Sequence, residues 1–455
     1  MAEIPAETSD KDWHEPRYAW YVVIILTLAY TLSFIDRQII SLLVGPIKED
    51  LGLSDFEISL LQGLAFASFY TLLGLPIGRL VDSKSRRTII AAGIFLWSLM
   101  TVACGLAKSY GQLFMARVGV GVGEATLSPS AYSMIADYFP KEKLSRALSF
   151  YFMGVYLGTG LAFILGGLVI QLVAEAGNVI IPMLGEIKAW QLTFIAVGLP
   201  GFLFVLVMFT VREPKRRGLI RMKGGAEPHK VSLGEALRFV GQRWKLYLPI
   251  GLGFAFHALV GYGSAAWTPE FFIRTFDMPR ADVAYVFGIL VLVFSTSGLL
   301  TGGWLADWLE ARGQADAKIR IAIYGNLGML IPAVLFPLMP TPTLAFSVLA
   351  FSFFFAGMPY GVGAASLQVV TPNQMRGLVS AIYLFLLNII GLGMGPSTVA
   401  FFTDFVFMDE ARLGWSISIT AAISIPVATF LLWLARGPYL AARAQAAAWE
   451  DITHE

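Results

Sequence analysis

Four ionisable side chains lie inside long apolar stretches of this sequence: Asp36, Arg37, Arg117 and Glu124. A charge within a hydrocarbon layer is costly unless it has a partner or faces water, so these four predict a polar cavity at that depth. A carboxylate in such a cavity can exchange its cationic partner for a proton. We therefore interpret Asp36 and Glu124 as proton-coupling groups.

The spacing of three residues orients this chemistry. Arg117, Gly121 and Glu124 follow one another at i, i+4 and i+7, which places them on one face of a helix. The two charges are then about 10 Å apart along the helix axis, which is too far for a direct pair. We expect each to find a partner on the first apolar span, and Asp36 with Arg117 is the natural pair.

The two arginines are the candidate anion-binding groups. A guanidinium can bind phosphate or carboxylate through two parallel hydrogen bonds, which lysine cannot reproduce. We assign substrate binding to Arg117 and also to Arg37, which lies about 100° around the helix from Asp36. The alternative is that all these charges form structural ion pairs that hold the helices together.

A second set of charges lies in a short turn that occurs twice. Residues 78–87 read Gly-Arg-Leu-Val-Asp-Ser-Lys-Ser-Arg-Arg, with Gly78 first and Asp82 fifth. Gly303 and Asp307 repeat this Gly-x-x-x-Asp core. The repeat follows an equivalent apolar stretch in the second half of the chain. This recurrence indicates an internally duplicated membrane transporter.

We interpret these turns as a conformational latch. Asp82 is expected to lie at the positive N-terminus of the helix that begins near Gly377, and Arg86 is expected to reach Asp137. Such contacts would close the cytoplasmic side and would break when the cavity opens there. The alternative is that the charged turn only directs topology. The full set of latch residues is Gly78, Asp82, Arg86, Arg87, Asp137 and Asp307.

Composition identifies the elements that must position these residues. Of 455 residues, 56% are hydrophobic and 14% are charged, which is too apolar for a soluble globular protein. Continuous apolar runs of about 20 residues, without alternation, predict membrane-spanning helices and not the strands of a barrel. We predict twelve spans, at 18–45, 57–81, 88–107, 112–136, 147–173, 190–211, 246–271, 282–305, 319–339, 344–370, 377–402 and 415–434.

The predicted fold is an all-α membrane protein with twelve transmembrane helices in two six-helix, pseudo-symmetric halves. A stretch with ten basic and three acidic residues, 212–245, separates the halves, and its part 231–240 is expected to lie on the membrane surface. The expected order is a cytoplasmic tail at 1–17, a first bundle at 18–211, the cytoplasmic linker at 212–245, a second bundle at 246–435 and a cytoplasmic tail at 436–455.

The basic residues predict the orientation. If both termini are cytoplasmic, the inside loops and termini hold 24 Lys and Arg and the outside loops hold six, a bias typical of inner-membrane topology. The net charge of +2 is then a consequence of topology and indicates no nucleic-acid partner. One cysteine, Cys104, excludes a disulfide framework within the chain.

The second half offers a different surface. At positions corresponding to Arg117 and Glu124, the tenth span is aromatic and uncharged, with Phe354 and Tyr360 among its residues. His257 and Asn388 add polar groups from the seventh and eleventh spans. If these four residues face the cavity, it is charged on one side and apolar on the other, which suits an amphiphile with an anionic head. The alternatives are aromatics that pack or face lipid, and a histidine that bonds helices together.

Several motifs resemble those of a known family. The run 78–87 resembles the first signature of the major facilitator superfamily, with departures at Ser83 and Ser85, and Arg117-x-x-x-Gly-x-Gly resembles its fourth-helix signature. Phe-Ile-Asp-Arg at 34–37, Arg-Val-Gly-Val-Gly-Val-Gly-Glu-Ala at 117–125 and Asp-Tyr-Phe-Pro at 137–140 are similar to the spinster-type lipid transporters. The resemblance implies export of sphingosine phosphate or lysophospholipid, coupled to protons.

Other functional classes fit less well. The sequence holds no His-Glu-x-x-His, Gly-x-Ser-x-Gly or Gly-x-x-x-x-Gly-Lys motif, so an enzyme is not expected. The alternative transporter is a proton symporter of small organic anions such as sugar acids, which would need several polar groups on the second face of the cavity. We expect a monomer in the cell (inner) membrane, with a lipid substrate, protons and membrane lipids as its partners and no metal or cofactor.

Overall fold

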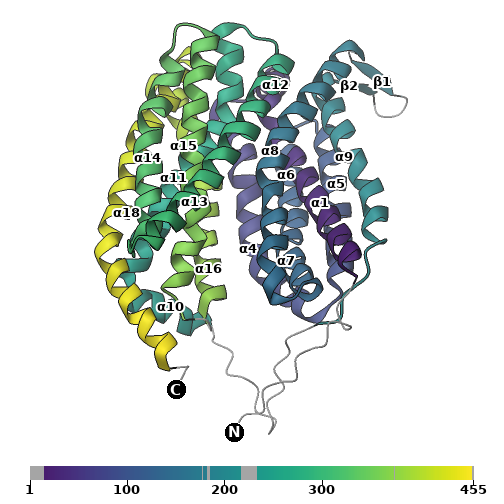
Figure 1. The fold of residues 1–455 in the computed structure, drawn as a ribbon. Helices are drawn as coiled ribbons and strands as arrows, with labels where there is room; N and C mark the ends of the chain where they lie inside the picture. The colour runs from purple at the N-terminus through teal and green to yellow at the C-terminus, as the bar shows by residue number, and fades with distance from the viewer. Residues whose placement is uncertain (1–14, 177, 182–184, 217–232, 373–374, 453–455) are drawn as a thin grey trace.

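The computed structural model describes residues 15–176, 178–181, 185–216, 233–372 and 375–452. Two helical bundles stand side by side, the N-terminal half in purple to teal and the C-terminal half in green to yellow (Figure 1). The N-terminal tail and much of the basic linker lie outside the described residues. We call the end at which α1 begins and α18 finishes the termini end, and the opposite end, which carries the β1–β2 hairpin, the hairpin end.

The N-terminal half runs from α1 to α9. Its elements are α1 (Pro16–Leu42), α2 (Val44–Leu51), α3 (Asp55–Gln62), α4 (Leu64–Ser83), α5 (Arg86–Gly105), α6 (Tyr110–Glu124), α7 (Leu127–Tyr138), α8 (Lys141–Ala176), β1 (Val179–Ile181), β2 (Gly185–Ile187) and α9 (Ala189–Met208). The two strands pair antiparallel, with Val179 opposite Ile187. Sequence analysis did not predict this hairpin.

The C-terminal half follows a short helix, α10 (Leu233–Gln242), in the region where a surface helix was expected. Its elements are α11 (Trp244–Phe276), α12 (Arg280–Leu290), η2 (Val291–Ser295), α13 (Thr296–Ala311), α14 (Ala317–Leu335), η3 (Phe336–Leu338), α15 (Pro342–Val369), α16 (Arg376–Leu386), η5 (Leu387–Gly393), α17 (Gly395–Phe401), η6 (Phe402–Phe407), η7 (Glu410–Arg412) and α18 (Leu413–Ile452). α18 continues without interruption into the stretch expected to be a tail.

Eleven helical segments of the described chain are long and apolar enough to cross a membrane. The remaining predicted span, 112–136, is divided into α6 and α7 by a turn at Ala125 and Thr126. Pro129 explains the break, because it has no N–H to donate to the carbonyl of Ala125. The predicted fold of twelve spans in two halves is confirmed.

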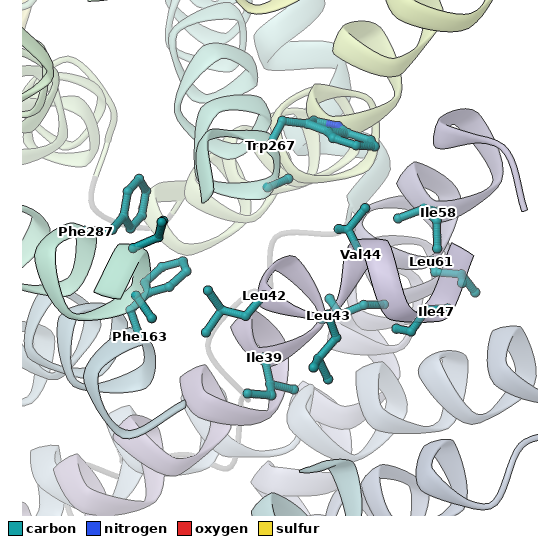
Figure 2. Packing of buried hydrophobic residues seen from close by; sticks show 14 of the residues in the cluster. Ile39, Leu42, Leu43, Val44, Ile47, Ile58, Leu61, Phe163, Trp267 and Phe287 are labelled. Carbon is teal, nitrogen blue, oxygen red and sulfur yellow. The ribbon is translucent and has the colours of Figure 1, made fainter. Parts of the chain in front are cut away.

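The halves meet mainly at the hairpin end. An apolar cluster there contains Ile39, Leu42 and Leu61 of the N-terminal half and Trp267 and Phe287 of the C-terminal half. Figure 2 shows Phe163 of the N-terminal half facing Phe287 of the C-terminal half across this boundary. The rings of Phe163 and Phe287 meet edge to face at 4.6 Å, a favoured aromatic geometry that joins α8 to α12.

Candidate functional site

Two helices bring the four predicted charges together in the N-terminal half. α1 carries Asp36 and Arg37, and the end of α6 carries Arg117 and Glu124. All four side chains are buried, with exposed fractions of 4%, 8%, 0% and 2% in that order. Because their formal charges cancel, the four groups can be buried at a lower cost than the same charges without partners.

A glycine sets the approach of α6 to its neighbour. A Cβ on Gly121 would lie 2.6 Å from the carbonyl oxygen of Phe66 in α4, closer than real contacts allow. Only glycine therefore permits α6 and α4 to meet backbone to backbone here. This contact brings the face of α6 that carries Arg117 and Glu124 within hydrogen-bonding reach of α1 and α3.

The central interaction is an ion pair between Arg37 and Glu124. Arg37 Nη2 donates to Glu124 Oε2 at 2.6 Å, and both side chains are buried. The guanidinium of Arg37 also lies over the rings of Phe66 at 4.4 Å and Phe34 at 4.8 Å. The cation–π contacts and the ion pair together offset the free-energy cost of burying the Arg37 guanidinium.

The predicted ion pair between Asp36 and Arg117 is wrong. Arg117 instead donates to three backbone carbonyls, those of Leu61 at 3.3 Å, Asp36 at 3.1 Å and Arg37 at 3.5 Å. Within the described chain the Asp36 carboxylate forms no ion pair, and its Oδ1 is buried without a hydrogen-bond partner. Helix rotation decides this outcome, because it turns the Arg117 fork toward the α1 backbone and not toward the carboxylate.

A small cavity between the halves lies next to Arg37. Its N-terminal wall is mainly polar, with Arg37, Gln38, Ser41 and Gln62 beside the apolar Ile40. Its C-terminal wall is largely apolar and contains the following residues: Tyr262, Ala265, Ala266, Leu392 and Pro396. Arg117 does not line this cavity. Gln38, Ser41 and Gln62 were not predicted from the sequence, although Gln38 and Ser41 lie one and four residues beyond Arg37 on the same helix.

The residues predicted on the second face lie in different surroundings. His257 is 1% exposed, and its ring nitrogens contact Asn326 Oδ1 at 2.7 Å and the Ala356 carbonyl at 3.1 Å. This geometry matches the helix-bonding alternative and not a substrate contact. Tyr360 packs edge to face on His257 at 5.0 Å.

The other two candidates of the second face are partly buried. Phe354 packs edge to face on Phe355 within the C-terminal half, at 5.3 Å between ring centroids. Asn388 lies in η5, a π-helical segment of the eleventh span. Neither lines the cavity beside Arg37.

The charged turn of the N-terminal half forms a buried cluster at the termini end. Arg86 contacts Asp137, as expected, and is completely buried. Sequence analysis missed Glu213, whose two carboxylate oxygens accept from Arg86 Nε at 2.7 Å and from the Arg87 backbone N–H at 2.9 Å. Glu213 thereby caps the N-terminus of α5. Burial would raise the pKa of Glu213, but these bonds and one from Ser85 hold it below its usual range.

The remaining latch candidates are less defined. The structure describes neither the side chain of Asp82 nor the burial of Gly78. Asp307 is exposed near the end of α13. A Cβ on Gly377 would meet no described atom within 4 Å. The latch role of these residues stays a prediction.

Residues 26–396 match the family model of the Major Facilitator Superfamily. The chain belongs to this superfamily. A major facilitator protein of this kind is a multi-pass membrane transporter and not an enzyme.

The chain is similar to known transporters of more than one kind. The chain is 29% identical to an MFS-type efflux pump of Mycolicibacterium smegmatis, over 95% of this chain and 96% of that protein. It is 24% identical to the probable L-galactonate transporter of Escherichia coli, over 84% of this chain and 82% of that protein. Protein spinster homolog 1 of Xenopus tropicalis is 29% identical over 63% of this chain and 54% of that protein.

A solved structure is similar along nearly the whole chain. It is a bacterial homolog of the human lysosomal transporter spinster, in an inward-facing and unoccupied conformation. The TM-score is 0.77 at 28% identity, over 96% of this chain and 99% of that one. The resemblance of this transporter to the spinster proteins is confirmed.

Proposed function

We propose that this transporter moves an anionic, single-chain lipid by alternating access, coupled to protons taken up by Asp36 and Glu124. One observation carries the proposal: the buried ion pair of Arg37 and Glu124 stands beside a cavity between the two halves. A proton on Glu124 would neutralise its carboxylate and leave Arg37 without its anion. A substrate anion could then take the place of Glu124 at Arg37.

The head-group role passes from Arg117 to Arg37 in this proposal. Arg117 is fully buried, and each of its three guanidinium nitrogens donates to a backbone carbonyl. Arg37 lines the cavity and has a buried Nε without a hydrogen-bond partner among the described residues. Arg117 in turn holds α6 against α1, so it positions Glu124 for the exchange.

The two walls of the cavity support an amphiphilic substrate. The N-terminal wall offers a cation, amide and hydroxyl groups and the side chain of Ile40, whereas the C-terminal wall offers mainly methyl, methylene and ring surface. A small hydrophilic anion would need polar groups on both walls. The spinster relatives favour the lipid, while the L-galactonate relative supports the second candidate, a proton symporter of sugar acids.

Competition binding on the purified protein tests the substrate class. The probe is a labelled single-chain lipid phosphate, displaced by unlabelled homologues of decreasing chain length and by a sugar acid. Each methylene removed should weaken binding by up to about 0.8 kcal/mol. Arg37→Lys should weaken all homologues by a similar factor, whereas Arg312→Lys, which changes an exposed arginine at the end of α13, should not.

The opposite result would overturn the lipid proposal. Equal competition at every chain length, or competition by the sugar acid alone, favours the organic-anion symporter. We also propose that the transporter is a monomer in the inner membrane, with both termini cytoplasmic.

A further inference from the structure

The second predicted span consists of two helices with different neighbours. α3 is separated from α4 by Gly63, whose backbone angles of φ −106° and ψ −81° interrupt the helix. α3 begins with a capping box in which Ser54 and Glu57 exchange hydrogen bonds, so it is a helix in its own right. This short helix lies at the hairpin end, where the two halves meet.

One face of α3 binds its own half through apolar side chains. Ile58 and Leu61 are completely buried, and Figure 2 shows them beside Val44 and Ile47 of α2. This packing removes apolar surface from water and keeps α3 with the N-terminal half.

The adjacent face of α3, about 100° further around the helix axis, is polar and binds the C-terminal half. Asp55, Ser59 and Gln62 lie within about 60° of one another around the helix. Ser59 Oγ donates to Ser397 Oγ at 3.1 Å, and Gln62 Nε2 donates to the carbonyl of Ala266 at 3.3 Å. Each of these bonds crosses the boundary between the halves.

Asp55 is the centre of an ion cluster on this face. It is completely buried and accepts two bonds from Arg274 of α11, at 2.7 and 2.9 Å. Lys48 of α2 also contacts Asp55, and Glu410 of the C-terminal half contacts Lys48 at 2.9 Å. Two cations and two carboxylates thus bridge the halves, one of each sign from either half, and Glu270 of the C-terminal half also accepts from Arg274 Nε at 2.9 Å.

A carboxylate from the other half completes the N-terminus of α3. Asp404 Oδ2 accepts from the backbone N–H of Phe56 at 2.7 Å, across 348 positions of sequence. The first N–H groups of a helix have no partner within it and carry partial positive charge. The ring of Phe405 meets that of Phe56 edge to face at 5.4 Å, which extends the same contact.

We propose that α3 is the lock that closes the hairpin end. Its polar face and N-terminus hold the C-terminal half and separate from it when the transporter opens at that end, while its apolar face stays with the N-terminal half. The chemistry of the two faces supports this division. Carboxylate, hydroxyl and amide groups can exchange protein partners for water, whereas Ile58 and Leu61 would lose burial if they separated. The inference does not depend on the substrate or on proton coupling.

A reversible crosslink tests the lock. In a Cys104→Ala background, Ser59→Cys with Ser397→Cys places two thiols where two hydroxyls now lie 3.1 Å apart. Oxidation should abolish transport, and a reductant should restore it. The matched control is Thr403→Cys with Ser416→Cys, which replaces a 2.8 Å hydroxyl pair inside the C-terminal half. Its oxidation should leave transport unchanged.

A charge variant gives an independent test. Spin labels at Lys108 and Thr343, both exposed and on opposite halves at the hairpin end, report the opening in lipid nanodiscs. Asp55→Asn should raise the ratio of open to closed molecules about tenfold or more. Asp50→Asn is the control, because Asp50 binds Lys188 and Trp190 within its own half.

Either of two results would overturn the proposal. One is transport that persists in the oxidised Ser59–Ser397 variant. The other is an identical distance distribution in Asp55→Asn and Asp50→Asn. If Asp55→Asn does not fold, the crosslink alone decides, because its reduced form retains small side chains at both positions.

Discussion

At the scale of single residues, the site depends on which buried charge meets which partner. Arg37 meets Glu124 directly, while Arg117 meets only carbonyl oxygens. An ion pair inside a membrane protein is costly to break, because the remaining charge stays buried. If Glu124 takes a proton while a substrate anion binds Arg37, neither residue is left as an unpaired buried charge, and the proposed proton coupling rests on this exchange.

The first prediction concerns the two carboxylates. Asp36→Asn and Glu124→Gln should each remove the response of transport to an imposed proton gradient, because neither amide can take up a proton. Transport in proteoliposomes with and without a pH difference measures the response, and Asp50→Asn serves as control. A normal response in both variants would remove these residues from the coupling mechanism.

A companion measurement separates function from stability. Arg37→Leu leaves Glu124 buried without its cation and should lower the free energy of unfolding by about 3–5 kcal/mol. Arg37→Leu with Glu124→Leu should be less destabilised than Arg37→Leu alone, since no unpaired charge remains. Thermal unfolding in detergent compares the two variants.

The second prediction is the pH dependence at Glu213. Its pKa is held below the usual range, so the carboxylate stabilises the fold above the pKa of the unfolded chain. This contribution is lost as the pH falls through the folded pKa. Glu213→Gln should therefore lower the Tm at neutral pH, and its Tm should approach that of the unmodified protein in acid. Glu175→Gln, at an exposed position, should show no such pH-dependent difference.

At the scale of elements, breaks in the helices determine where the halves touch. Span two is interrupted at Gly63, and span eleven contains the π-helical segment η5. A Cβ on Gly63 would lie 2.7 Å from the Gly393 carbonyl and 2.8 Å from that of Leu392. The two broken spans therefore meet backbone to backbone, next to the polar face of α3.

The third prediction uses this contact. Gly63→Ala should push spans two and eleven apart, because backbone atoms cannot move aside as side chains can, at a cost of about 1–3 kcal/mol. The distance between labels at Lys108 and Thr343 should increase. Gly74→Ala is the control in the same span, since a Cβ there meets no described atom within 4 Å. Equal distances in the two variants would contradict the prediction.

At the scale of the whole molecule, the contacts between the halves concentrate at the hairpin end. The apolar cluster of Figure 2, the α3 lock and the Gly63 contact all lie there. The described arrangement is thus closed at the hairpin end. The distribution of basic residues in the sequence predicts that the termini end faces the cytoplasm.

The fourth prediction tests that orientation. In a Cys104→Ala background, a single cysteine at Lys108 should react with a membrane-impermeant maleimide on intact cells, because it lies at the hairpin end. A cysteine at Arg312, at the termini end, should react only after the membrane is permeabilised. Both positions are exposed, so access to the side chain is matched. The reverse pattern would invert the proposed topology.

The spans could be predicted from the sequence because the length and apolarity of a helix are local properties. The predicted limits 88–107 and 319–339 correspond closely to α5 (Arg86–Gly105) and α14 with η3 (Ala317–Leu338). The spacing of Arg117 and Glu124 likewise placed both on one helix face beside α1. Signature runs around Gly78 and Arg117 were sufficient to indicate the superfamily.

Partners between helices were decided only by the tertiary structure. The ion pair of Arg37 with Glu124, the burial of His257 against Asn326 and the cap from Asp404 to Phe56 all depend on how far each helix is rotated and displaced. A rotation by one residue, about 100°, changes which side chain faces a neighbour, and sequence periodicity does not specify it. The sequence by itself therefore determined which charges enter the membrane, and packing between helices decided which of them meet.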